Sequence, residues 1–189
     1  MGNIEERYYH RLYEIAAEIN SVNSGDKVLQ FTVESICRTM EAKGCSLMFL
    51  TGDRKSLVHS VSCGLSRDFT DVGPRSVEKS LPETLVGKGK IATVYEIASE
   101  KDRVQFPERA IREGLVSILA VPVKLRDDII GQLRVYTSQP RNFTEDDKFF
   151  VQAVANLAAI ALENIKLLES SQKAYDALTN DFIGYRFTR

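Results

Sequence analysis

The apolar positions near the start of the chain repeat with a helical period. They fall at spacings of three and four residues, at Leu12, Ile15, Ala16 and Ile19. This spacing predicts a helix over residues 8–19. The turn-rich stretch NSVNSGD interrupts it, and a second helix is expected from about Asp26, with Gly44 as its C-cap.

Alternating and continuous apolar runs then predict strands. CSLMFL and SLVHSVSC flank the turn-like TGDRK and indicate a hairpin, and KIATVYEI predicts a third strand. The stretch from Gly114 to Thr137, GLVSILAVPVKLRDDIIGQLRVYT, predicts a second hairpin. The segment between the hairpins is irregular and polar, with short helices expected after Pro82 and from Pro107 to Gly114.

A long helix is predicted after the second hairpin, at NFTEDDKFF. Thr144 and Asp147 stand three residues apart there and fit a capping box. The order of elements is helix, helix, hairpin, loop-rich segment, hairpin, helix. It predicts an α+β fold with a central antiparallel sheet, terminal helices on one face and the loop-rich segment on the other.

The second hairpin has two unlike faces. A turn at Arg126–Asp128 would place Leu125 opposite Ile129. One face is then wholly apolar and should meet the helices: Leu119, Val121, Val123, Gly131, Leu133 and Val135. The other face is mixed: Ile118, Ala120, Pro122, Gln132, Arg134 and Tyr136. The mixed face is either solvated or the floor of a ligand pocket under residues 64–113.

The last helix carries two apolar stripes, at spacings of three and four. The first comprises Val151, Val154, Ala158, Ala161, Ile165 and Leu168, and the second Phe150, Ala153, Leu157, Ile160 and Leu167. A helix with two apolar sides needs two partners. One should be its own sheet, and the other is the N-terminal helix or a second subunit. This predicts a homodimer through the terminal helices; the alternative is burial of both stripes within one subunit.

Composition narrows the function classes. The 189 residues include 25 basic and 26 acidic side chains, a net charge of −1, which gives no pull toward nucleic acid or a membrane surface. Neither a long apolar run nor a signal peptide is evident, which predicts a cytoplasmic protein. Three cysteines and two histidines without ligand spacing predict neither a disulfide framework nor a metal site.

The C-terminal half resembles the GAF domain family. The matching features run in order: a Gly, a Ser-x-Leu-x-Val-Pro strand, a charged turn, Ile-Gly-x-Leu, a Phe-Thr-x-x-Asp helix start and an Ala-rich helix ending in Glu-Asn. In this chain they are Gly114, Ser117, Leu119, Val121, Pro122, Ile130, Gly131, Leu133, Phe143, Thr144, Asp147, Glu163 and Asn164. The resemblance covers residues 10–168. It implies a sheet between terminal helices and a variable ligand-side segment, and sensory or regulatory work in signalling proteins.

The resemblance also suggests a division of the chain. Residues 1–22 form an N-terminal helix of the helical layer, residues 23–168 the GAF domain, and residues 169–189 a tail or signalling-helix extension. Cyclic-nucleotide binders of the family carry an Asn-Lys-x-Phe-x-Asp-Glu signature that YEIASEKDRVQFPER does not keep. Cys63 is a poor candidate for bilin attachment and His59 for a haem ligand, and VGKGKI fails P-loop spacing. No cofactor is therefore assigned.

The expected function is a non-catalytic sensor that binds an unidentified small molecule and relays its state through dimerising terminal helices. The candidate ligand residues are His59, Ala120, Arg134 and Tyr136. One alternative is a ligandless interaction or dimerisation module. A less favoured one is a thiol redox sensor, since Cys45 should lie opposite Cys63, or a free methionine sulfoxide reductase. Residues 64–113 contain no cysteine for that enzyme.

Overall fold

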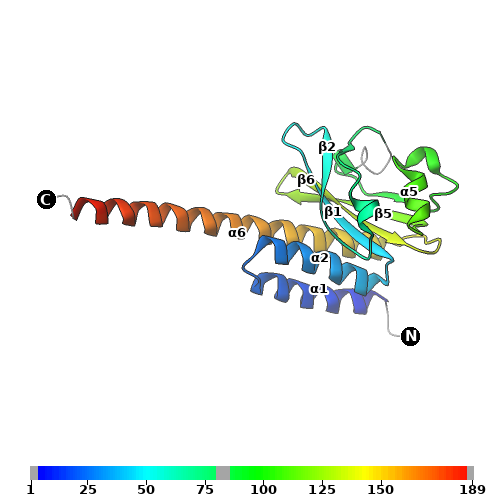
Figure 1. Cartoon of the computed structure of the whole chain (residues 1–189). Helices are drawn as coiled ribbons and strands as arrows, with labels where there is room; N and C mark the ends of the chain where they lie inside the picture. Colours follow the sequence, from blue (N-terminus) through cyan, green and yellow to red (C-terminus); the bar gives the residue numbers. More distant parts are fainter. Residues whose placement is uncertain (1–3, 80–85, 187–189) are drawn as a thin grey trace.

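The fold places one antiparallel sheet between a helical layer and a loop-rich layer (Figure 1). The computed structural model describes residues 4–79 and 86–186. The elements are α1 (Ile4–Ser21), α2 (Gly25–Met40), β1 (Gly44–Leu50), β2 (Ser56–Cys63), α3 (Arg67–Thr70), β3 (Arg75–Ser76), β4 (Ala92–Val94), the 3₁₀ turn η1 (Lys101–Arg103), α5 (Pro107–Arg112), β5 (Ser117–Leu125), β6 (Asp128–Thr137) and α6 (Glu145–Arg186). The six strands lie in the order β3-β2-β1-β6-β5-β4. This confirms the predicted α+β class.

Both hairpins have the predicted register at the end away from the turn, and in the first hairpin a bulge after Leu47 shifts the remaining pairs by one residue. Cys45 lies opposite Cys63 in the β1–β2 pair. In the β5–β6 pair Val123 faces Gly131, as expected, but the tip differs, because Leu125 pairs with Asp128 and not with Ile129. Arg126 adopts a left-handed backbone (φ 55°), which allows a tighter turn, and a bulge beside Val123 absorbs the extra residue.

The helix ends follow local chemistry, with one correction. The prediction that Gly44 caps α2 is wrong. Glu41 takes the left-handed conformation there (φ 52°) and its N–H donates to the Cys37 carbonyl, while Gly44 opens β1. The capping box of α6 is confirmed, because Thr144 N–H donates to the Asp147 carboxylate at 3.0 Å and Asp147 N–H to Thr144 Oγ1 at 3.1 Å. The helix start expected at Pro82 lies outside the described residues.

The main core lies between the sheet and the helical layer. The apolar face of the second hairpin packs there against α1, α2 and α6, as predicted, through residues that include Leu119, Val121, Val123, Leu133 and Val135. The ring of Tyr8 on α1 stacks on Phe150 of α6 with centroids 4.6 Å apart. The helical layer is therefore fixed to one face of the sheet, and the opposite face is left to the loop-rich layer.

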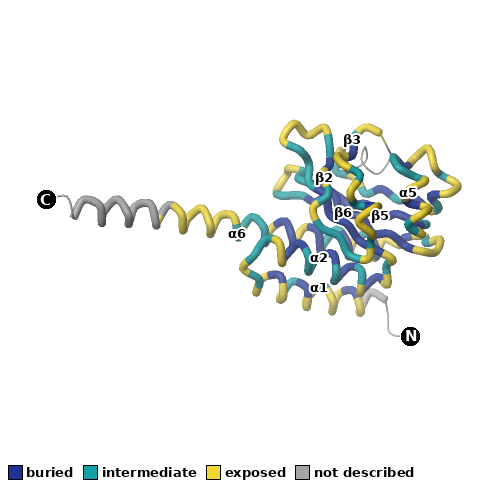
Figure 2. The backbone as a smooth tube through the Cα atoms, viewed as in Figure 1, coloured by how far each residue is buried: buried dark blue, intermediate teal, exposed yellow. Residues whose placement is uncertain are grey.

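Both apolar stripes of the long helix α6 are buried near the start of the helix, where Phe150 lies, and become exposed further along it. Val151, Val154, Ala158 and Ala161 of the first stripe are buried. Ile160 and Leu167 of the second stripe are 52% and 59% exposed, and Leu168 is exposed as well. Beyond the domain α6 projects as a single helix, whose surface is exposed where side chains are described (Figure 2).

Helix α6 also meets a length-and-composition criterion for crossing a membrane. Among the described residues it is the one helix that does so, over Glu145–Lys173. The core helix of a globular domain meets the same criterion, and the first turns of α6 pack on the sheet through Phe150, Val151 and Val154. Its apolar composition is thus accounted for in part by packing.

Candidate functional site

The face of the sheet that points away from the helices supports a second, smaller core. Side chains from α3, α5 and the neighbouring loops cover it, and they pack on residues of β4, β5 and β6. The cluster comprises Phe69, Val86, Ala92, Val94, Ile97, Val104, Ala110, Leu115, Ile118, Ala120 and Tyr136. The mixed face predicted from the sequence is therefore covered, not solvated.

The four predicted site residues all lie on this covered face. Ala120 of β5 is paired with Arg134 of β6, and Tyr136 follows two residues later on the same strand. All three are buried. His59 lies on β2, two strands away from β6, and is half-buried. Ala120 and Tyr136 pack in the second core, so their side chains fill this layer from the sheet side.

Two further polar residues join Arg134 in the interior. The Arg134 guanidinium donates from Nη2 to Oε1 of Gln132 at 3.1 Å, and Gln132 is fully buried. Arg75 of β3 is also buried, and its guanidinium carbon lies 5.5 Å from the Phe69 ring centroid and 5.2 Å from that of Phe106. Buried guanidinium groups are uncommon, and they are favoured where aromatic rings or polar groups surround them.

These two residues differ in how far the sequence marks them as part of this face. Gln132 occupies the same face of β6 as Arg134 and Tyr136, so strand alternation was a sufficient signal for it. Arg75 lies in a two-residue strand within a polar segment, where no periodicity marks a buried side chain. It reaches the face only because β3 pairs with β2, placing Arg75 opposite Leu57.

Tyr136 is held from two directions. Its hydroxyl shares a hydrogen bond with Ser46 of β1 at 3.4 Å. Its ring meets the Phe69 ring edge-on, with centroids 5.6 Å apart and an interplanar angle of 88°. Tyr136 therefore connects the sheet to α3 of the covering layer.

His59 and Gln105 each keep a buried atom with unused hydrogen-bonding capacity near this face. Within the described part of the chain, His59 Nε2 and Gln105 Oε1 are buried and have no hydrogen-bond partner. Burial lowers the pKa of His59 from its usual value, the positive charge of Arg75 lowers it further, and Asp71 opposes the shift. A neutral imidazole can offer a donor or an acceptor to a bound group.

We expect this histidine to make stability depend on pH. The unfolded imidazole takes up a proton near its ordinary pKa of 6.5, whereas the folded one resists protonation until lower pH. Its contribution to the free energy of unfolding is therefore complete above the unfolded pKa and declines as the pH falls through the folded pKa. Urea unfolding at about pH 7.5 and about pH 5.5 measures the loss, and His59→Gln should reduce it.

The matched control is His10→Gln, because His10 is exposed on α1. This variant should retain the wild-type loss of stability between the two pH values. An unchanged loss in the His59→Gln protein would contradict the assignment of the effect to His59.

We call Arg75, Gln132, Arg134, Tyr136 and His59 the distal cluster. Guanidinium groups suit carboxylate and phosphate oxygens, and the adjoining rings suit a planar or apolar body. The described residues include no group of three or more His, Cys, Asp or Glu side chains placed to hold a metal ion. Cys45 and Cys63 pack on the opposite side, in the main core, so their thiols do not face the distal cluster.

Comparison with known proteins assigns the family. A family model described as the GAF domain matches residues 24–164. The chain is 27% identical over 194 residues to the dual 3′,5′-cyclic-AMP and -GMP phosphodiesterase 11A of Takifugu rubripes. The alignment spans 92% of this chain but only 20% of the phosphodiesterase, about a fifth of its length.

Solved structures agree on the fold. Free methionine-R-sulfoxide reductase from Neisseria meningitidis, solved with its substrate, superposes with a TM-score of 0.75 at 14% identity and covers 89% of this chain and 95% of its own. The GAF domain of a two-component sensor histidine kinase from Bacillus halodurans gives 0.62 at 18% identity, over 78% of this chain and 99% of its own. GAF domains thus occur in sensor and signalling proteins and are generally regulatory. With the family model matching most of its length, this chain belongs to the GAF domain family.

Proposed function

We propose that this chain is a non-catalytic sensor domain that binds a small anionic molecule at the distal cluster. The observation that carries the proposal is the burial of Arg75 and Arg134 on the sheet face away from the helices, beside fully buried Gln132. Arginine pairs with carboxylates and phosphates through two parallel hydrogen bonds. Phe69, Phe106 and Tyr136 would contact the apolar part of such a ligand.

Strand β6 would connect the ligand to the helices. Arg134 lies on its distal face, while Leu133 and Val135 on either side belong to the main core that contains α6. A ligand that shifts β6 on the distal face would therefore also move Leu133 and Val135, which lie in the core with α6. A relay of this kind requires a ligand with different affinities for two arrangements of that interface.

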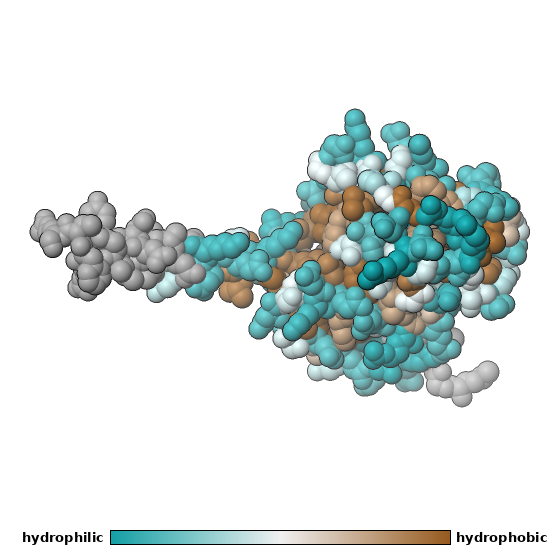
Figure 3. Space-filling view, in the orientation of Figure 1, coloured by the Kyte–Doolittle hydropathy of each residue, from teal (hydrophilic) through white to brown (hydrophobic). Residues whose placement is uncertain are grey.

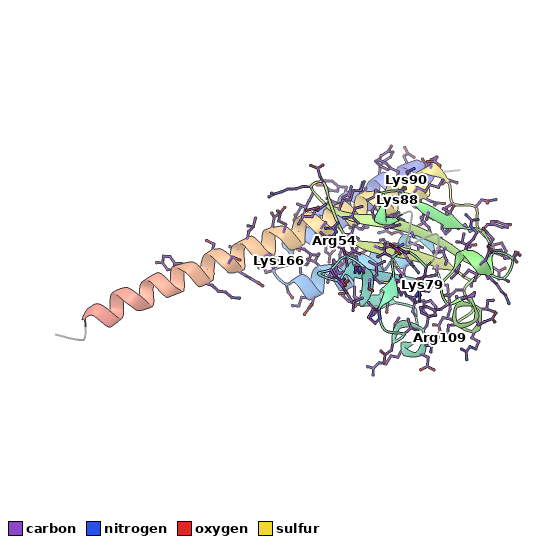
Figure 4. The ribbon with its side chains drawn as sticks, turned by 90° about the horizontal axis from the view of Figure 1, so that it is seen from above. Arg54, Lys79, Lys88, Lys90, Arg109 and Lys166 are labelled. Carbon is purple, nitrogen blue, oxygen red and sulfur yellow. The ribbon has the colours of Figure 1, made fainter. Side chains whose placement is uncertain are left out.

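The output would pass through a homodimer of terminal helices. Ile160, Leu167, Leu168 and Tyr175 are exposed along α6, and an apolar stretch is visible where the helix leaves the domain (Figure 3). Basic side chains such as Lys88, Arg109 and Lys166 are spread over the domain and α6 (Figure 4), which does not favour a polyanion as partner. We therefore propose that the protein works in the cytoplasm and binds neither nucleic acid nor a membrane.

A ligandless dimerisation module is the second candidate. It is favoured by the close packing of Ala120 and Tyr136 in the second core and by the exposed apolar positions of α6. Both candidates require the same homodimer, and the second differs from the first only because no small molecule is bound.

Native mass spectrometry of the protein as purified from cells separates the two candidates. We expect a dimer with a reproducible extra mass that is lost on denaturation. Arg134→Gln should remove the extra mass, because it removes a buried guanidinium from the distal cluster. The matched control is Arg38→Gln, an exposed arginine on α2 in the helical layer, which should retain the mass.

Circular dichroism of both variants checks that they fold, and His59→Ala provides a second variant at the half-buried end of the distal cluster. A dimer of bare chain mass, unchanged by anionic metabolites added at millimolar concentration, would favour the ligandless module. A bare monomer would contradict the dimeric relay in both candidates.

A further inference from the structure

Three cysteines that are distant in the sequence meet on the helix side of the sheet. Cys37 lies in the last turns of α2, Cys45 near the start of β1, and Cys63 at the end of β2. All three belong to or pack against the main core. The Cys37 thiol donates a hydrogen bond to the Cys63 carbonyl oxygen, with the sulfur 3.7 Å from the oxygen.

The three thiols differ in access to solvent. Cys45 is fully buried, whereas Cys37 and Cys63 are half-buried at the margin of the core. A dissolved oxidant therefore reaches Cys37 and Cys63 before it reaches Cys45. Burial raises the pKa of Cys37 to about 12, with the nearby Cys63 contributing, and burial raises the pKa of Cys45 well above its usual value. Cys37 and Cys45 thus remain protonated at neutral pH. We take Cys63 as the attacking thiol because it is half-buried at the margin of the core and a dissolved oxidant can reach it.

The geometry also distinguishes the possible pairs. Cys45 and Cys63 are direct cross-strand neighbours, and such positions hold their Cβ atoms about 4.5–5.5 Å apart, at or beyond the upper end of the usual disulfide range. Cys37 lies on helix α2 in the helical layer and takes no part in strand pairing. The Cys37 sulfur already lies 3.7 Å from the Cys63 carbonyl oxygen, and a bond between the two sulfurs would join α2 to β2 and replace no strand pair.

We propose that Cys37 and Cys63 form a reversible disulfide in response to hydroperoxides. The Cys63 thiolate attacks the O–O bond, and Cys63 becomes a sulfenic acid while the peroxide, taking up a proton, leaves as water or alcohol. The Cys37 sulfur then attacks the Cys63 sulfur, and its proton leaves with the hydroxyl as water. Two electrons pass from the two sulfurs to the peroxide, and a dithiol reductant reverses the reaction.

The disulfide would tie the end of α2 to the end of β2, two segments 26 residues apart. Closing a loop of this length removes conformational entropy from the unfolded chain, so oxidation should raise the melting temperature. This site is independent of the distal cluster, because the thiols lie on the opposite side of the sheet.

The test uses hydrogen peroxide on the full chain under native conditions. We expect a loss of about 2 Da in intact mass and a rise in melting temperature, both reversed by dithiothreitol. Trypsin places the three cysteines in separate peptides, Val28–Arg38, Gly44–Arg54 and Ser56–Arg67. The first and third should be recovered as one linked species from the wild type and from Cys45→Ala.

Two further variants make the result decisive. Cys63→Ser should lose the reaction, and Cys37→Ser should stop at the Cys63 sulfenic acid, which dimedone labels. A link between Gly44–Arg54 and Ser56–Arg67 would overturn the proposed pairing. Recovery of all three peptides unlinked from folded, peroxide-treated wild type would overturn the proposal as a whole.

Discussion

Gly131→Ala is expected to destabilise the domain by about 3 kcal/mol or to prevent its folding. A Cβ atom at this position would lie 2.3 Å from the Met48 carbonyl oxygen and 3.1 Å from a ring carbon of Phe49. The Met48 oxygen is backbone in β1, a central strand paired on both sides, so it cannot move without disturbing the neighbouring ladders. Urea unfolding followed by circular dichroism measures the change in the free energy of unfolding.

Gly52→Ala is the control for this substitution. Gly52 lies in the β1–β2 turn, and a Cβ there meets no atom within 4 Å. Its free energy of unfolding should stay within about 0.5 kcal/mol of the wild type, as for most surface changes. If Gly131→Ala were equally mild, β1 and β6 would have to separate more easily than their pairing indicates.

Asp147→Ala is expected to cost about 3 kcal/mol and to loosen α1. The Asp147 carboxylate is buried and accepts three hydrogen bonds, from Tyr8 Oη at 2.6 Å, from Arg141 Nη2 at 2.8 Å and from Thr144 N–H at 3.0 Å. The substitution leaves a partly buried guanidinium without its carboxylate and removes one of the two hydrogen bonds of the α6 capping box, from Thr144 N–H to the carboxylate. Because Tyr8 belongs to α1, the same change weakens the attachment of α1 to α6.

Urea unfolding measures the stability loss, and hydrogen exchange over residues 4–21 measures the loosening of α1. Asp146→Ala is the matched control, because Asp146 is the exposed neighbour in the same helical turn. Unchanged protection of α1 in Asp147→Ala would show that the other contacts of α1, such as the Tyr8–Phe150 ring contact and the burial of Ile15 and Ile19, suffice to hold the helix in place.

Strand alternation was sufficient to predict the two faces of the sheet. The period of two assigned Arg134 and Tyr136 to one face and Leu133 and Val135 to the other, and the structure has them there. Register followed from turn position, which placed Cys45 opposite Cys63. It failed toward the turn of both hairpins, where a bulge after Leu47 in the first and a bulge after Val123 in the second shift the pairing by one residue. No pattern in side-chain polarity marks such a bulge.

What the sequence by itself determined was local: the helices and their capping box, the strands and their faces, and the motifs that mark the GAF family. The tertiary structure alone decided which distant residues meet. It brought Arg75 beside the covered face, Cys37 beside Cys63, and α1 against only one end of α6. These contacts join residues that are far apart in the sequence, and they depend on how the helical and loop-rich layers pack on the sheet. A side chain carries no periodic signal for a partner in another layer, so the distal cluster and the thiol pair became visible only in three dimensions.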